Sequence, residues 1–253
     1  MKILLTNDDS HDSPLFHYAI ERFQEMGDLK VVVPKEEQSW KGKSMTRFEP
    51  MDLETRTICG VTAHILDGTP ADCANFGIYH LFEDKPDLVI SGVNMGSNVG
   101  IGFAFSSGTI GACLEGNIAG VPGIAISQLL DRSLFRQWYV DRSFPEDVLA
   151  RLHAQSDRLL DRVFEDLYHQ DGFWKTPVTW NVNLPYEAVP DCDLVWAFLG
   201  QTFYGSCFKK EDGKVVHDLD TVKMDEREQA DGVVVRGGHV SLTRLDMRSF
   251  GQV

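Results

Sequence analysis

Two adjacent carboxylates, Asp8 and Asp9, follow the apolar run Ile3–Leu5 almost directly. Neighbouring carboxylates repel each other, and neither is easily buried unless a positive charge lies between them. Asn and Asp are also common in turns, so the segment Asn7-Asp8-Asp9 is explained either by a turn or by a bound cation. The second explanation predicts a divalent metal site at the end of the first strand.

Further polar residues follow the next two apolar runs of the chain. Ser39 lies a few residues after Pro34, and Asn94 and Asn98 follow the run Asp87–Ser91. Ligands of an open parallel sheet bind beyond the carboxyl ends of its strands, so these side chains should share one edge with the two carboxylates. Carboxylates, a hydroxyl and amides suit Mg²⁺ or Mn²⁺ better than zinc. Ser39 also fits an ordinary loop serine.

The segment 106–109 reads Ser-Ser-Gly-Thr and precedes a stretch with helical spacing. Backbone N–H groups at a helix start, small hydroxyl residues and a glycine that permits close approach can hold a phosphate. The same residues also fit an ordinary N-cap. Because the segment is expected beside the metal site, we predict a phosphate-binding turn made by Ser106, Ser107, Gly108 and Thr109.

Other catalytic patterns fit the sequence less well. It contains no G-x-S-x-G nucleophile elbow, and no G-x-G-x-x-G follows the first strand. Lys41–Ser44 ends like a Walker motif, but the first glycine of that motif would fall on Glu37. The eight histidines show no ligand spacing, and only His11 lies beside the acidic pair.

The composition of the chain argues against several classes of binding partner. The formal net charge is −14 and no Lys/Arg run occurs, which argues against a nucleic-acid polymer as partner. Five scattered cysteines without a C-x-x-C pair indicate reduced, mostly buried thiols. No signal-peptide pattern or apolar run near 18 residues occurs, so we expect a cytoplasmic protein without a membrane partner.

Strand and helix patterns alternate in the first half of the chain. Apolar runs predict strands at 3–5, 31–33, 87–91 and 121–127, and helical spacing predicts helices at 14–26, 69–82 and 109–119. Residues 52–57 and 61–66 resemble an antiparallel pair, whereas 35–50 and 92–108 have the composition of loops. This order predicts an α/β fold with a doubly wound, mostly parallel sheet and right-handed crossovers.

The pattern changes near residue 130. One long amphipathic helix is predicted at 144–170, strands at 178–185 and 193–199, and a long hairpin at 201–220 around Asp212-Gly213. We expect a catalytic core at 1–130 and a C-terminal part at 131–253, together forming one continuous domain. Such a hairpin is often a dimerisation arm.

Several motifs together resemble the SurE family of stationary-phase survival proteins. The first 128 residues contain "KILLTNDD", "GTPADC", "PDLVISGVNMGSNVG" and "SSGTIGACLEG", and the second half matches more faintly at "NVNLP" and "GGHVSLTRL". The resemblance implies a Rossmann-like fold and metal-dependent hydrolysis of nucleoside 5′-monophosphates. It also implies activity of some relatives on 3′-nucleotides, other phosphoesters or short polyphosphates.

The resemblance further implies one divalent cation per subunit, Mg²⁺ or Mn²⁺, and a small phosphoester substrate. The residues that match its metal ligands are Asp8, Asp9, Ser39 and Asn94. Asn98 and residues 106–109 match the segment around the phosphate, and Asp8 and Asn98 are the expected catalytic residues. Asp8 would orient or deprotonate the attacking water, and Asn98 would stabilise the phosphoryl oxygens. A homodimer through the hairpin arm, or a homotetramer, is also implied.

This sequence departs from the family pattern at three positions. Ser10 stands where the family has Gly, Leu15 follows Pro14 where Gly is usual, and Trp40 follows Ser39 where a small residue is usual. Trp40 would either stack on a nucleobase or narrow the pocket against one. The alternatives are therefore a phosphatase for a non-nucleotide ester and a non-catalytic nucleotide- or phosphate-binding protein.

Overall fold

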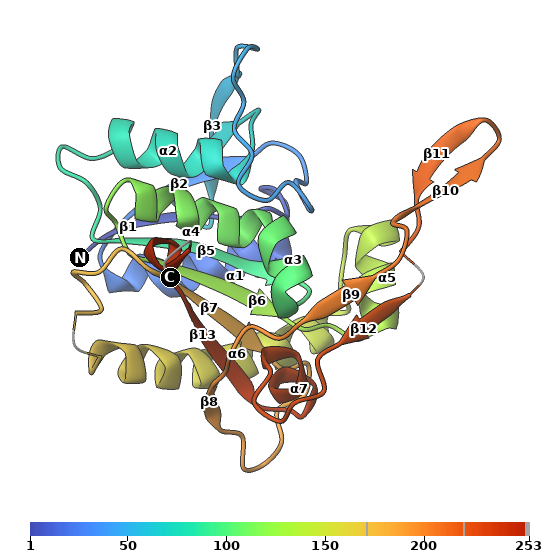
Figure 1. Cartoon of the computed structure of the whole chain (residues 1–253). Helices are drawn as coiled ribbons and strands as arrows, with labels where there is room; N and C mark the ends of the chain where they lie inside the picture. The colour runs from blue at the N-terminus through green and yellow to red at the C-terminus, as the bar shows by residue number, and fades with distance from the viewer. Residues whose placement is uncertain (171, 220, 251–253) are drawn as a thin grey trace.

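The computed structural model describes residues 1–170, 172–219 and 221–250. Its centre is a nine-stranded sheet in the order β3-β4-β2-β1-β5-β6-β7-β13-β8 (Figure 1). The strands are β1 Lys2–Thr6, β2 Asp28–Pro34, β3 Leu53–Ile58, β4 Val61–Leu66, β5 Leu88–Met95, β6 Gly123–Gln128, β7 Thr179–Leu184, β8 Leu194–Trp196 and β13 Val240–Leu245. The predicted α/β fold with a mostly parallel sheet is confirmed.

Helices cover both faces of this sheet. They are α1 Pro14–Phe23, α2 Pro70–His80, α3 Gly100–Ser106, α4 Gly108–Ile118, α5 Arg132–Asp141, α6 Glu146–Tyr168 and α7 Asp231–Arg236, with short 3₁₀ turns at Gln24–Met26 and Met247–Ser249. Figure 1 shows α2 and α4 on one side of the sheet and α6 on the other.

Alternation along β1 explains the two layers. Ile3 and Leu5 pack into the core with α1 and α6, whereas Leu4 packs with α2 and α4 on the opposite face. Successive side chains of a strand point to opposite faces, so a continuous apolar run is what a strand covered on both sides requires. All three side chains are completely buried.

Strands from the second half of the chain extend the same sheet. β7 pairs in parallel with β6, β13 is antiparallel to β7, and β8 is parallel to β13. The other edge is the predicted antiparallel pair β3–β4, which is confirmed. One sheet therefore runs from the N-terminal half into residues beyond 130.

Two helices were not predicted from the sequence. α3 falls in the stretch read as a loop, because Gly100 and Gly102 lower its helix propensity and no side chain caps its N-terminus. α5 buries only Leu134 and Trp138, so its apolar stripe is too narrow to stand out in the sequence. The strand predicted at 193–199 is shorter, spanning Leu194–Trp196.

The predicted hairpin is confirmed as a two-part arm. Its tip is the antiparallel pair β10 (Phe208–Glu211) and β11 (Lys214–His217), which turns at Asp212 and Gly213 with φ of +49° and +78°. Its base is the pair β9 (Thr202–Tyr204) and β12 (Val222–Met224), so the arm extends past the predicted end at 220, a residue outside the described ones. The arm projects from the body of the molecule (Figure 1).

The five cysteines are all free thiols, and Cys73, Cys113 and Cys192 are buried, as predicted. Burial raises the pKa of the Cys73 thiol well above its usual value, which keeps it protonated and unreactive. Over the part of the chain that the structure describes, no helix combines the length and the apolar character needed to span a membrane.

Candidate metal and phosphate site

A pocket of about 170 Å³ lies beyond the carboxyl ends of β1 and β5. It brings together most of the residues that the sequence singled out. Those that line it are Asp8, Ser39, Asn94, Asn98, Ser106 and Ser107, and the other lining residues include Trp40, Phe103 and Phe135. Asp9, Gly108 and Thr109 contact the pocket residues from behind.

Asp8 is held at the pocket by the first turn of α4. Its Oδ1 accepts a hydrogen bond from the Thr109 hydroxyl at 2.7 Å, and its Oδ2 accepts one from the Thr109 N–H at 3.1 Å. A Cβ at Gly108 would lie 2.9 Å from the Asp8 Cβ, so glycine permits this close approach. Burial raises the pKa of Asp8 to about 6, against the opposing effect of the Thr109 hydrogen bonds.

Asp9 lies beside Asp8 and is also buried. Its Oδ2 accepts the Met95 N–H at 2.7 Å, which fixes it against the end of β5. Burial, and then the charge of Asp8, raise the pKa of Asp9 well above its usual value. Among the described residues, neither carboxylate forms an ion pair with Lys, Arg or His. The charge of Arg142 acts in the opposite direction and lowers the pKa of Asp9, but the two buried carboxylates have no ion-pair partner among the described residues.

Ser39 and Asn94 reach the same pocket from two other elements. The loop that carries Ser39 is fixed by hydrogen bonds from the Gln38 N–H to the Asp8 carbonyl and from the Gly42 N–H to the Ser106 carbonyl, both 2.8 Å. The Asn94 Nδ2 donates to the Gly96 carbonyl at 3.1 Å, so its Oδ1 is the atom that can serve a ligand.

The donor chemistry fits a hard divalent cation. No group of three or more His, Cys, Asp or Glu side chains is placed to hold a metal within residues 1–170, 172–219 and 221–250. Asp8, Ser39 and Asn94 nevertheless line one pocket, and the Asp9 carboxylate lies beside it, hydrogen-bonded to the N–H of the pocket residue Met95. An all-oxygen set of this kind suits Mg²⁺ or Mn²⁺, and a cation would neutralise the buried carboxylates.

The Ser-Ser-Gly-Thr turn forms the start of α4, and its members have different contacts. Ser107 is the N-cap, whose Oγ accepts the Ile110 N–H at 3.1 Å, and it donates to none of the described residues. Ser106 donates to the Gly102 carbonyl at 3.1 Å, and Thr109 is engaged with Asp8. The Ser107 hydroxyl is therefore the side-chain donor of this turn that is free to bind a ligand.

Asn98 connects the start of α4 to the sheet. Its Nδ2 donates to the Ser127 Oγ at 2.8 Å and to the Thr109 Oγ1 at 3.3 Å. Asn183 and Asn181 of β7 hold its backbone N–H and carbonyl at 2.8 and 2.9 Å. Both Nδ2 hydrogens are thus used within the protein, and Asn98 positions Thr109, which in turn binds Asp8.

Sequence reasoning missed two groups of residues at this site. Asn181 and Asn183 are fully buried, although they alternate with apolar residues along β7 as in a strand with one solvent-exposed face, so no signal in the sequence revealed their role. Phe103 and Phe135 line the pocket from α3 and α5, the two helices that the sequence did not reveal.

Ser10 and Trp40, two of the positions where this sequence departs from the family pattern, share one backbone property. Their φ angles are +71° and +63°, in the left-handed region that glycine adopts most easily. The positions where the family pattern has Gly or a small residue therefore keep a left-handed backbone here, although both residues carry a side chain.

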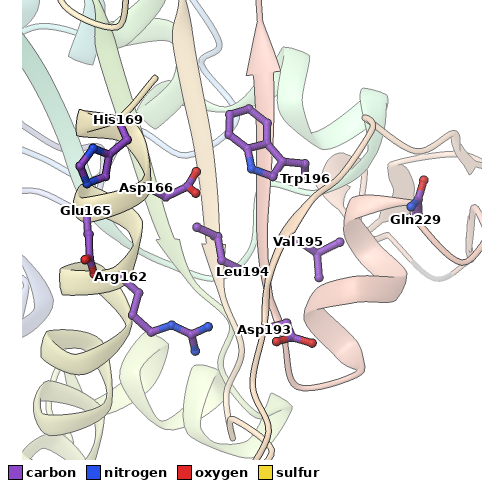
Figure 2. A pocket seen from close by; sticks show the side chains of 9 residues that line it. All are labelled: Arg162, Glu165, Asp166, His169, Asp193, Leu194, Val195, Trp196 and Gln229. Carbon is purple, nitrogen blue, oxygen red and sulfur yellow. The ribbon is translucent and has the colours of Figure 1, made fainter. Parts of the chain in front are cut away.

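A larger cavity of about 680 Å³ lies between α6 and β8 (Figure 2). Its lining residues are Arg162, Glu165, Asp166, His169, Asp193, Leu194, Val195, Trp196 and Gln229. None of the residues that the sequence singled out for chemistry lines it, and it lies at the β8 edge of the sheet. The smaller pocket at the ends of β1 and β5 is therefore the candidate functional site.

Comparisons with known proteins agree with the fold. A family model described as "Survival protein SurE" matches residues 3–205. A protein named 5′-nucleotidase SurE from Methanocella arvoryzae is 33% identical over 99% of this chain and 94% of its own length. One of the same name from Methanothermobacter thermautotrophicus is 40% identical over 83% of this chain and 77% of its own length. The crystal structure of SurE protein from Aquifex aeolicus aligns with a TM-score of 0.69 and 27% identity, covering 98% of this chain and 95% of that one.

Proposed function

The chain belongs to the SurE family, and from that membership we propose that it is a metal-dependent 5′-nucleotidase, a phosphomonoester hydrolase. The observation that carries the proposal is the buried Asp8–Asp9 pair, in which neither carboxylate has an ion-pair partner among the described side chains. Asp8 lines the pocket, and Asp9 lies beside it and accepts the N–H of the pocket residue Met95. Burying two such charges is costly unless a cation binds between them.

We propose that one Mg²⁺ or Mn²⁺ per subunit is held by Asp8, Asp9, Ser39 and Asn94. When bound, the cation polarises the phosphoryl group and supplies an activated water for in-line attack. Asp9 is fixed by the Met95 N–H and Asp8 by Thr109, so both carboxylates are oriented before a cation arrives. Asp8 is further proposed to orient the attacking water.

The phosphate is proposed to bind at the start of α4. The Ser107 hydroxyl is available as a donor, and the N-terminus of this 11-residue helix favours a negative charge. Asn98 contributes by holding Thr109 and Ser127 in place. With a formal net charge of −14, the protein needs such local positive potential to bind an anionic substrate.

The arm supports the proposal of a homodimer, which could assemble further into a homotetramer. Phe203, Phe208 and Val215 on the arm are large apolar side chains, and each is at least 60% exposed. Exposed apolar surface of this kind marks interaction sites, and a second copy of the chain offers the matching arm.

The test of the function is phosphate release from a panel of substrates. The panel contains 5′- and 3′-nucleoside monophosphates and p-nitrophenyl phosphate, measured in chelator and again with Mn²⁺ or Mg²⁺ restored. We expect release that requires the metal and is fastest with a 5′-nucleotide. Release from only the non-nucleotide ester would indicate another phosphatase, and nucleotide binding without release would indicate a non-catalytic binding protein.

A further inference from the structure

Aromatic side chains from three separate segments line the candidate pocket. Trp40 comes from the loop after β2, Phe103 from α3 and Phe135 from α5. The carboxylates, amides and hydroxyls that suit a metal and a phosphate line the same pocket. The site therefore combines a polar part with an aromatic wall that the hydrolysis of a phosphoester does not itself require.

Trp40 is held in place by neighbours on three elements. Its ring lies 5.6 Å from Phe103, 5.3 Å from His217 and 6.2 Å from Tyr204, with interplanar angles of 82°, 62° and 73°. Edge-to-face contacts of this kind are favourable for aromatic rings. Because Tyr204 and His217 belong to β9 and β11, the arm itself fixes the indole at the pocket.

The indole is nevertheless accessible, and its backbone is unfavourable. The Trp40 side chain is 41% exposed, and the residue has a φ of +63°. A bulky residue rarely adopts this conformation, and residues held in such conformations cluster at ligand sites. Trp40 combines an accessible ring, an unfavourable backbone conformation and a place in the pocket lining, which together indicate contact with a ligand.

Phe135 adds a third aromatic side chain to the pocket. Within the described part of the chain, Phe135 makes no ring contact with Trp40 or Phe103, although all three line the pocket. Phe135 is itself 45% exposed. A flat aromatic ligand can stack on such side chains regardless of its hydrogen-bonding pattern.

We propose that Trp40 is the main wall of a nucleobase subsite, so that this chain selects phosphoesters that carry a base over those that carry a sugar alone. The inference rests on the proposed function, because it concerns the substrate of the same site. It assigns Trp40 the role of a specificity-determining residue, and it assigns Phe103, Tyr204 and His217 the role of holding the indole.

The test compares adenosine 5′-monophosphate with ribose 5-phosphate, which lacks the base, in the full-length protein with Mn²⁺. The ratio of their kcat/KM values isolates the contribution of the base. Trp40→Gly removes the ring at a backbone position that glycine adopts easily, so the variant should fold. We expect the ratio to fall roughly tenfold, in line with the loss of one base–aromatic stack.

Two further variants test whether the effect depends on an aromatic ring at position 40. Trp40→Phe keeps an aromatic face and should retain most of the ratio. Phe48→Ala removes an aromatic ring from the same loop that is 83% exposed and does not line the pocket, so the ratio should not change. A ratio that is unchanged or raised in Trp40→Gly, or lowered equally in Phe48→Ala, overturns the proposal.

Binding of adenosine separates this inference from the proposed function. Adenosine lacks a phosphate, so calorimetry on the metal-free protein reports on the base subsite alone. We expect wild-type protein to bind it at least about fivefold more tightly than Trp40→Gly does. If wild type releases no phosphate but shows this difference, the hydrolase proposal fails and the subsite stands. If wild type hydrolyses both esters and binds adenosine no better than the variant, the subsite is wrong.

Discussion

At the scale of single residues, Asp8 and Asp9 are oriented from opposite sides. Thr109 at the start of α4 binds Asp8, and Met95 at the end of β5 binds Asp9. These contacts keep both carboxylates buried and leave their repulsion uncompensated by any described Lys, Arg or His in ion-pair contact. In the proposed mechanism a cation removes that repulsion, so the same contacts that orient the ligands also create the affinity for metal.

Thr109 is the residue whose replacement tests this orientation. Thr109→Val keeps the shape of the side chain but removes the hydroxyl that donates to Asp8 at 2.7 Å and accepts from Asn98 at 3.3 Å. Loss of a partner that orients a metal ligand typically costs roughly 10–100-fold in metal affinity or activity. We expect a loss of that size in both Mn²⁺ affinity, measured by calorimetry, and kcat/KM. Thr109→Ser keeps the hydroxyl and should retain most of both; equal losses in the two variants would contradict the role of the hydrogen bonds.

Ser10 provides a separate test of backbone strain. Its φ is +71°, and its hydroxyl donates to Asp12. Ser10→Gly and Ser10→Ala both lose this hydrogen bond, but only alanine keeps the cost of a left-handed backbone, about 1–2 kcal/mol. The glycine variant should therefore melt roughly 2–8 °C above the alanine variant in thermal unfolding with chelator present. Equal melting temperatures would show that the left-handed conformation is not a source of strain.

At the scale of elements, the close packing of α4 against the loop after β2 positions Ser39 and Trp40. A Cβ at Gly111 would lie 2.2 Å from the Gly42 carbonyl oxygen, so the loop rests directly on the backbone of the helix. The Gly42 N–H also binds the Ser106 carbonyl at 2.8 Å. Two segments distant in sequence are therefore held together at the pocket by backbone contacts.

Gly111→Ala tests this contact. The added methyl group must push the Gly42 backbone away and with it the loop that carries Ser39. Displacements of about 1 Å at a catalytic group can cost roughly 100-fold, so we expect kcat/KM to fall by about 10–100-fold while circular dichroism stays unchanged. Gly205→Ala is the matched control, because a Cβ there has no atom within 4 Å. Full activity in Gly111→Ala would mean that the loop position does not matter for catalysis.

Part of this arrangement could be predicted from sequence. β1 and the first three residues of β5 are apolar runs, and α2 and α4 begin with capping residues, so local patterns identify them. Residues 92–95 at the end of β5 lie in the stretch predicted as a loop, because a serine, a glycine and an asparagine interrupt the apolar run. The joint placement of their polar ends follows from parallel sheet topology. α3 and α5 escaped prediction because glycines and a narrow apolar stripe hide their periodicity, and Phe103 and Phe135 escaped with them. Hydrogen bonds such as that between Thr109 and Asp8, 101 residues apart, have no local signature at all.

At the scale of the whole molecule, the sheet and the arm position different residues of the pocket. The sheet continues through β7, β13 and β8, and β7 supplies the asparagines that hold Asn98. The arm projects from this body (Figure 1). It contacts Trp40 through Tyr204 of its base and His217 of its tip. Arm position and pocket shape are therefore linked in one subunit, and pairing of arms in an oligomer would stabilise both.

The proposed dimer gives a prediction for the arm. Phe208 and Val215 are 60% and 65% exposed, and we expect wild-type protein to have twice the mass of one chain, or four times for a tetramer, in light scattering. Replacing both by Ser removes the apolar surface and should shift the population to monomers. Lys210→Ser changes an exposed residue of the same strand and should leave the mass unchanged. A wild-type monomer, or an unchanged oligomer in the double variant, would contradict the role of the arm.

The most direct test of the account is Asp9→Asn, compared with Glu36→Gln. Both changes remove one negative charge, but Glu36 is exposed and lies outside the pocket. Mn²⁺ binding is measured by calorimetry and phosphate release from a 5′-nucleotide with and without chelator. Loss of a residue that hydrogen-bonds a metal ligand lowers metal affinity or activity roughly 10–100-fold, so loss of a ligand itself should lower them at least about 100-fold. We predict that Asp9→Asn loses Mn²⁺ affinity and phosphate release by this factor, with an unchanged circular dichroism spectrum, and that Glu36→Gln keeps both. Metal-dependent phosphate release retained by Asp9→Asn would contradict the proposed metal site.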